Sequence, residues 1–168
     1  MTFTDSYLAG FFDGEGCIGL YKNGGKSFHL RIQLVQNESR IVTDMFQQLQ
    51  ARFGGNFRGH RSASGRSKYN LQLNSDKAVC FLTAIQPYLR LKRLEAELAI
   101  LWHASRPKVA RGEKGRIQSY PPEQQAFDAR IAELIRTLKR RDSSEILLAR
   151  PDLRAAALQL GISEERLN

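Results

Sequence analysis

The sequence predicts an α+β domain with the element order α-β-β-α-β-β-α, followed by further helices. Two pairs of segments alternate apolar and polar residues with a period of two, and Gly- or Ser-rich turns join each pair. The segments around them instead repeat apolar residues at helical spacing. The 168 residues fit one domain. We divide it into a core over 1–104, a basic loop over 105–122 and C-terminal helices over 123–168.

The first half of the chain supplies two helices and two strand pairs. Thr4 or Asp5 can cap a helix that runs to about Gly14. The strands CIGLYKN and SFHLRIQLVQN follow, joined by a turn at 23–26, and later NFRGHR and KYNLQLN are joined by SASGRS. Between the pairs, Asn37 is expected to cap a helix that ends at Gly54. Its expected buried face consists of Ile41, Met45, Phe46, Leu49 and Phe53.

The second half is predominantly helical. Ser75 opens a helix through Ile85, and after Gln86-Pro87 a long helix runs to about His103. The expected apolar residues of that long helix are Leu91, Leu94, Leu98 and Leu101. A helix over 123–140 follows, and short helices broken by Pro151 and Gly161 form the tail. The buried stripe of the helix over 123–140 is expected to be Phe127, Ile131, Leu134, Ile135 and Leu138.

The charge of the chain favours a polyanionic partner. Lys and Arg number 26 against 17 Asp and Glu, which gives a formal charge of +9. Nucleic acid is the leading candidate for a protein this small, and a solvated basic surface without a partner is the alternative. Cys17 and Cys80 form no CxxC pair, and we expect both to be small core residues in a reducing compartment. With no signal peptide and no membrane span in the sequence, we expect an intracellular protein that is not secreted.

The opening stretch YLAGFFDGEG breaks two local rules of helices. Gly10 and Gly14 each cost a helix interior about 1 kcal/mol relative to Ala, and Asp13 and Glu15 crowd the negative end of the helix dipole. The spacing G-x-x-x-G removes side chains from one line of the helix, so that the same helix of a second subunit can pack against it. Two facing carboxylates then favour a shared Mg²⁺. Tight packing within the chain and a surface turn are the structural alternatives, and the EF-hand pattern is absent.

LAGFFDGEG at 8–16 resembles the motif that names the LAGLIDADG homing endonucleases. VQNESR at 35–40 and QPYLRLK at 86–92 are similar to the two downstream active-site segments of that family. The resemblance covers residues 7 to about 104, and the single motif is similar to the small homodimeric branch. It implies the αββαββα LAGLIDADG fold, in which a four-stranded antiparallel sheet forms a DNA-binding saddle.

The resemblance also implies roles for individual residues. Glu15 takes the place of the catalytic metal-binding acid, and Gly14 would lend its carbonyl oxygen to the metal. Asp13 is expected to be structural. Gln36 resembles the residue that orders water around the nucleophile, and Arg40 and Lys92 resemble the basic pair near the scissile phosphate; taken alone, the two cations are ordinary solvated helix charges. The implied dimer interface consists of Leu8, Gly10, Phe11 and Gly14.

Alternation in the strand pairs predicts a polar sheet face without acids. Arg on guanine and Asn or Gln on adenine are the bidentate pairings of the major groove, and a twisted antiparallel ribbon fits that groove. The predicted DNA-binding residues of the strands are Tyr21, Asn23, His29, Arg31, Gln33, Arg58, His60, Arg61, Lys68, Asn70 and Gln72. Basic clusters at 106–116 and 138–144, the second with Lys139 and Arg141, suit phosphate contact.

Together these features predict a homodimeric, site-specific double-strand DNA endonuclease. The resemblance implies Mg²⁺ as cofactor, with Mn²⁺ or Ca²⁺ able to substitute in binding, and cleavage of a long pseudo-palindromic site with short 3′ overhangs. It further implies an origin in a mobile intron or intein, in a bacterial cytoplasm or an organelle such as a chloroplast or mitochondrion. The alternatives are an RNA maturase on the same fold and a DNA-binding regulator that has lost cleavage.

Overall fold

A computed structural model describes residues 2–23, 27–61, 67–107 and 120–167. The expected turns at 24–26 and 62–66 and most of the basic loop therefore lie outside the described residues. The described chain divides into two compact units, the first made of residues up to 18 together with 30–96, the second of 19–29 and 97 onward. Each unit is considered by itself.

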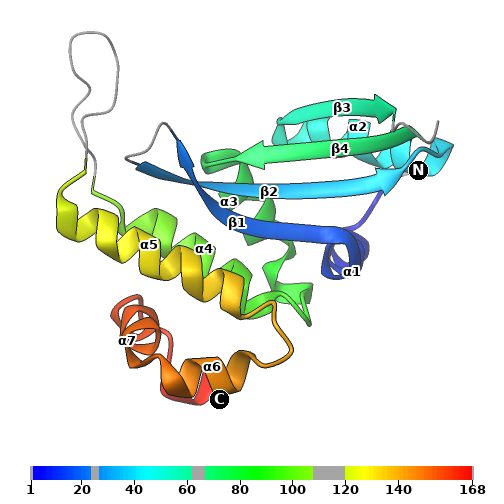
Figure 1. The fold of residues 1–168 in the computed structure, drawn as a ribbon. Coiled ribbons are helices and arrows are strands. Elements are labelled where there is room, and N and C mark those ends of the chain that lie inside the picture. Colours follow the sequence, from blue (N-terminus) through cyan, green and yellow to red (C-terminus); the bar gives the residue numbers. More distant parts are fainter. Residues whose placement is uncertain (1, 24–26, 62–66, 108–119, 168) are drawn as a thin grey trace, which may run out of the picture. The chain divides into compact units, whose positions relative to one another are not determined.

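Most of a four-stranded antiparallel sheet belongs to the first unit, as the sequence predicts, and residues 19–23 and 27–29 of its first two strands belong to the second. Its strands are β1 (Gly16–Asn23), β2 (Ser27–Asn37), β3 (Asn56–Arg61) and β4 (Ser67–Asn74), in the spatial order β1-β2-β4-β3 (Figure 1). Residue 34 of β2 pairs with residue 71 of β4, and residue 58 of β3 pairs with residue 70 of β4. The helices are α1 (Asp5–Glu15), α2 (Arg40–Phe53) and α3 (Asp76–Ile85), followed by the short 3₁₀ helix η1 (Gln86–Tyr88). This is the predicted α+β order.

Aromatic and aliphatic side chains fill the space between the sheet and these helices. The rings of Phe12 and Phe81 meet edge to face with centroids 5.3 Å apart, a favourable aromatic geometry. The inward residues of the two central strands are almost wholly buried, as alternation predicts: Leu30, Ile32, Leu34, Leu71 and Leu73. The opposite face of these strands is thereby left to the polar residues between them.

The ends of the helices explain where α1 and α2 begin and stop. Thr4 caps α1 and accepts a hydrogen bond from the Tyr7 N–H at 3.3 Å. Gly16 follows α1 in an extended conformation, and a side chain is excluded there because a Cβ would lie 2.2 Å from the Phe12 ring. Ser39, rather than the predicted Asn37, caps α2, since its Oγ accepts from the Val42 N–H at 3.2 Å while residue 37 still belongs to β2.

Three residues expected in the core are exposed. Ile41 is 66% exposed, because the buried stripe of α2 begins instead at Val42 and repeats at helical spacing from there. Leu91 is 76% exposed, since it lies in the bend before α4, which begins at Arg93, so the helical period does not apply to it. Cys80 lies on the outer side of α3, so it is not the small core residue that was expected.

The second unit is mainly helical. It contains most of α4 (Arg93–Ser105), then α5 (Pro122–Thr137), α6 (Ser143–Ala149), α7 (Pro151–Gln159) and the 3₁₀ helix η2 (Glu164–Leu167). The predicted stripe of α5 is confirmed at Phe127, Ile131, Leu134 and Ile135, and Leu138 just beyond the helix is half-buried. Trp102 of α4 is fully buried, and its indole N–H donates to Asp128 at 2.8 Å. None of the described helices is long and apolar enough to cross a bilayer.

Candidate catalytic site and nucleic-acid interface

The first acid of the opening motif holds two parts of the first unit together. Asp13 is 9% exposed, and its carboxylate accepts hydrogen bonds from the backbone N–H groups of Arg90 at 2.8 Å and Lys92 at 2.9 Å. The Lys92 ammonium group donates in turn to the main-chain oxygen of Asp13. This cation thus satisfies one of the carbonyl groups that a helix leaves unpaired at its C-terminus. The segment 90–92 is fixed at the end of α1 as a result.

The second acid is placed differently. Glu15 is the last residue of α1 and is exposed. The helix stops there, so no following helical turn uses the carbonyl oxygens of Gly14 and Glu15. A carboxylate beside free carbonyl oxygens is the hard-oxygen donor set that Mg²⁺ and Ca²⁺ prefer. The described residues of one chain contain no cluster of three His, Cys, Asp or Glu side chains able to hold a metal. A complete site would therefore need oxygens from DNA, water or a second copy.

One face of α1 is open. Gly10 and Gly14 are exposed, and a Cβ built on either would meet no atom within 4 Å. Phe11 is half-buried and contacts Phe46 edge to face, with centroids 6.4 Å apart. Leu8 is only 3% exposed and packs in the core of its own chain, and its place at a dimer interface stays a prediction. The two glycines leave space for another backbone along this face.

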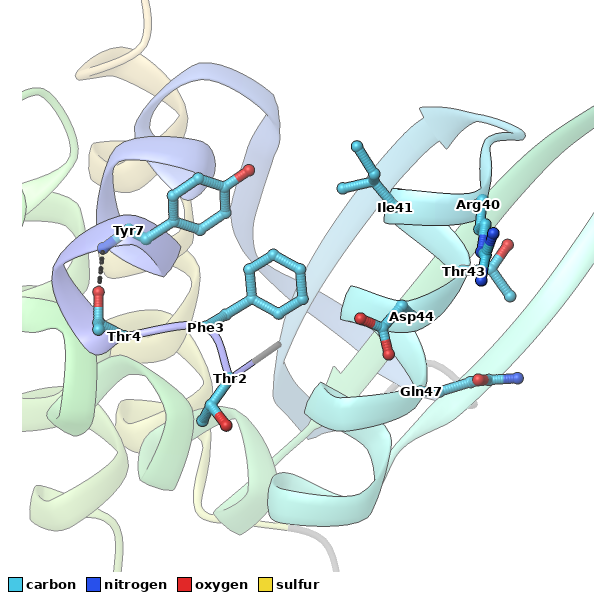
Figure 2. Close-up of a pocket in the computed structure, with 9 residues that line it drawn as sticks. All are labelled: Thr2, Phe3, Thr4, Tyr7, Arg40, Ile41, Thr43, Asp44 and Gln47. Atoms are coloured by element: carbon cyan, nitrogen blue, oxygen red, sulfur yellow. Dashed lines mark hydrogen bonds between the residues drawn. The ribbon is translucent and has the colours of Figure 1, made fainter.

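Gln36 and Arg40 flank the connection between β2 and α2. The Gln36 side chain accepts a hydrogen bond from the neighbouring Asn37 N–H at 2.8 Å. Arg40 is the exposed first residue of α2 and borders a hollow of about 900 Å³. Figure 2 shows this hollow, with the side chains of Tyr7 and Ile41 directed toward it from α1 and α2.

The outer face of β2, β4 and β3 carries its side chains in rows that follow the strand register. In one row Gln33 lies opposite Gln72, which lies opposite Asn56. The other rows are Arg31 with Asn74, then Val35 with Asn70 and Arg58, then Asn37 with Lys68 and His60. Every member except Val35 is polar or basic and none is acidic, as the sequence predicts. Such a face presents donors and amides to a ligand without repelling phosphate.

The remaining predicted DNA-binding residues lie elsewhere. Alternation places Arg61 on the face opposite to Arg58 and His60, exposed at the end of β3. In the second unit, the rings of Tyr21 and His29 are 6.3 Å apart. Lys139 and Arg141 are exposed just after α5, and the side chain of Asn23 lies outside the described part.

Sequence reasoning missed four residues of the outer face, Val35, Asn37, Asn56 and Asn74. Val35 is 42% exposed among polar neighbours, and Asn56 opposes Gln72 at the first position of β3. The alternation of each strand, followed over its full length, would have placed all four on this face.

Comparisons with known proteins agree with this geometry. The model of the family described as LAGLIDADG endonuclease matches residues 8–96. The homing endonuclease I-CvuI, crystallised with its target in the presence of Ca, superposes with a TM-score of 0.58 at 19% identity, covering 95% of each chain. I-GzeII in complex with its DNA target superposes with a TM-score of 0.52 at 18% identity, covering 81% of this chain and 44% of that one. No curated protein sequence matches the chain.

Proposed function

The chain belongs to the LAGLIDADG endonuclease family, and from this premise we propose that it cuts double-stranded DNA at a specific site as a homodimer. The observation that carries the proposal is the exposed Glu15 at the end of α1, two residues after the anchored Asp13. An acid beside phosphates weakens binding, so a protein that only binds DNA has no use for it. The acid-free sheet face supports DNA as the partner.

The residues at the end of α1 fit a divalent metal. Glu15 would bind Mg²⁺ through its carboxylate and Gly14 through its carbonyl oxygen. When bound, such an ion stabilises the attacking and leaving oxygens of phosphodiester hydrolysis. I-CvuI was crystallised with DNA in the presence of Ca and of Mg, which supports the same class of ion here. Mn²⁺ would also suit this oxygen donor set.

The basic and amide residues have separate parts in this proposal. Lys92 holds the Asp13 carbonyl group and so orients the last turn of α1, while Arg40 supplies positive charge for a phosphate. Gln36 orders water near the cut. The two exposed glycines of α1 pack against the same helix of the second copy, which brings two Glu15 side chains together. The target is then pseudo-palindromic, and cleavage leaves short 3′ overhangs inside a cell or organelle.

The Glu15→Gln variant tests the proposal. It should keep its affinity for the selected target and lose Mg²⁺-dependent cutting, because the amide removes the negative charge that holds the ion. The matched control is Glu123→Gln, an exposed acid in the first turn of α5, which should cut like the parent. Continued cutting by Glu15→Gln would exclude the proposed metal site. Specific binding to double-stranded DNA without cutting by the parent would identify a regulator, and preference for intron RNA would identify a maturase.

A further inference from the structure

The row formed by Val35, Asn70 and Arg58 contains an unmade hydrogen bond. The amide oxygen of Asn70 is covered from solvent and accepts no hydrogen bond. A buried acceptor left unpaired is unfavourable, because it has lost its hydrogen bond to water and gained none in return. Such an oxygen calls for a donor from outside. The terminal amide turns easily about its last torsion, which has a broad energy profile.

Asn70 stands directly beside a strong donor group. Arg58 of β3 is its register partner across the strand pair and is exposed. Together with Asn56 and Gln72 they line a hollow of about 200 Å³ on the outer face of the sheet. Gln72 is turned toward Asn74, to which its amide nitrogen donates at 3.1 Å. The Arg58 guanidinium group is thus an exposed donor at this hollow, and the Asn70 oxygen is its covered, unpaired acceptor.

This pairing matches one base pair. In the major groove guanine offers two acceptors, N7 and O6, and its partner cytosine offers one amino donor. Directly opposite residues of antiparallel strands have their Cβ atoms about 5 Å apart, so both side chains can reach the same pair. An adenine–thymine pair offers Arg58 no two adjacent acceptors, because the adenine amino donor lies between adenine N7 and thymine O4. In a reversed C·G pair, Arg58 faces the cytosine amino group, so that donor meets donor. We propose that Arg58 and Asn70 together read a single G·C pair in each half-site.

In this arrangement Arg58 donates to N7 and O6 of the guanine, and the Asn70 oxygen accepts from the amino group of the paired cytosine. The next row, Gln72 with Asn56, lies about 7 Å further along the strands. That distance is about two base-pair steps of 3.4 Å, so the two rows read separate positions. The inference rests on the proposed function, because it names the base pair that the sheet face selects.

The test is a binding selection from randomised double-stranded DNA with the full chain and Ca²⁺, which keeps the measurement separate from cleavage. The parent should enrich G·C at one symmetric pair of positions. Arg58→Ala and Asn70→Ala should each lower that preference at least about fivefold, at the same positions. The double variant should lose little more than the stronger single one, because the two residues act on one base pair. The control Gln33→Ala should relax a different position.

Two further measurements separate the role of each residue. Asn70→Asp keeps an acceptor, so it should retain the G·C preference while binding all DNA more weakly. Replacing the guanine by 7-deazaguanine should weaken binding by the parent and leave Arg58→Ala unaffected. Relaxation at two different positions, or a uniform loss of affinity for all sequences, would overturn the inference and leave the proposed endonuclease intact. If the parent enriched no sequence, the proposed function itself would fail.

Discussion

Asp13 and Lys92 are joined at two points, although they lie 79 positions apart in the chain. The backbone N–H of Lys92 donates to the Asp13 carboxylate at 2.9 Å, and the Lys92 ammonium group donates to the Asp13 main-chain oxygen. The two acids of the opening motif therefore differ in their surroundings. Asp13 is buried and holds the downstream segment, whereas Glu15 is exposed.

Asp13→Asn should destabilise the chain by about 1 to 3 kcal/mol, because the amide can accept only one of the two backbone hydrogen bonds and sets an NH₂ group against the other. Urea unfolding measures this loss. The cleavage rate at saturating DNA should fall as well, since the support of the last turn of α1 is weakened. The control is Asp44→Asn, where the new amide oxygen can still accept from Gln48. Equal stability of the two variants would contradict the structural role of Asp13.

Gly10→Ala should change two properties in opposite directions. An added Cβ meets nothing within 4 Å in its own chain, and Ala favours a helix interior by about 1 kcal/mol over Gly. The protomer should therefore gain stability. The new methyl group should also block the close approach of a second α1, so that the dimer begins to dissociate at a higher protein concentration than the parent does. Sedimentation equilibrium over a dilution series measures the second effect. Ala126→Leu, on an exposed position of α5, is the control, and an unchanged dimer in Gly10→Ala would show that this face is not the interface.

Val35 should contact the methyl group of a thymine. It is the exposed apolar member of the described outer rows, and apolar contact with that methyl group is the way such a side chain reads a major groove. Replacing individual thymines of the selected target by deoxyuridine should weaken parent binding at one symmetric pair of positions. Val35→Ala should be insensitive to the same replacement. If both proteins responded alike, Val35 would not be near any thymine methyl group.

The fold and most of the outer face could be predicted from the sequence because both depend on local periodicity. The period-two strands fixed which side chains share a face, and Thr4 could be identified as a cap from its place before an apolar run. The hydrogen bonds of Asp13 could not be found this way, since they join segments far apart in the chain. Leu8 shows the same limit. The motif does not tell which of its apolar residues pack inside their own chain, and only the packed core shows that this leucine is buried.

Asp128→Ala should destabilise the second unit by at least about 1 to 3 kcal/mol, because the buried Trp102 N–H loses its acceptor. Asp128 also accepts from Gln124 at 2.8 Å and faces the Arg106 guanidinium group, which lies over the Trp102 ring. Trp102 is the single tryptophan of the chain, so its fluorescence during urea unfolding reports on this site directly. Glu123→Ala, an exposed position of the same helix, should stay within about 0.5 kcal/mol of the parent. A similar shift in both variants would exclude the buried network as the cause.

Arg150 should make the thermal stability of the second unit depend on acid pH. Its guanidinium group donates to Glu133 at 2.7 Å and to Asp152 at 2.8 Å, and these hydrogen bonds hold the pKa of both carboxyl groups below their ordinary values of 4.5 and 3.8. A carboxyl group whose pKa is lower when folded stabilises the chain above its unfolded pKa, and that stability is lost as the pH falls through the folded pKa. Arg150→Gln should therefore lower the Tm at pH 7, and the difference from the parent should shrink below about pH 4.5 and vanish in stronger acid. Both partners are partly exposed, so added salt should also reduce the difference. Differential scanning calorimetry from pH 7 to pH 2 measures this difference in Tm, with Arg130→Gln as an exposed control on α5. A difference that stayed constant across this range would mean that Arg150 stabilises the unit through packing instead of charge.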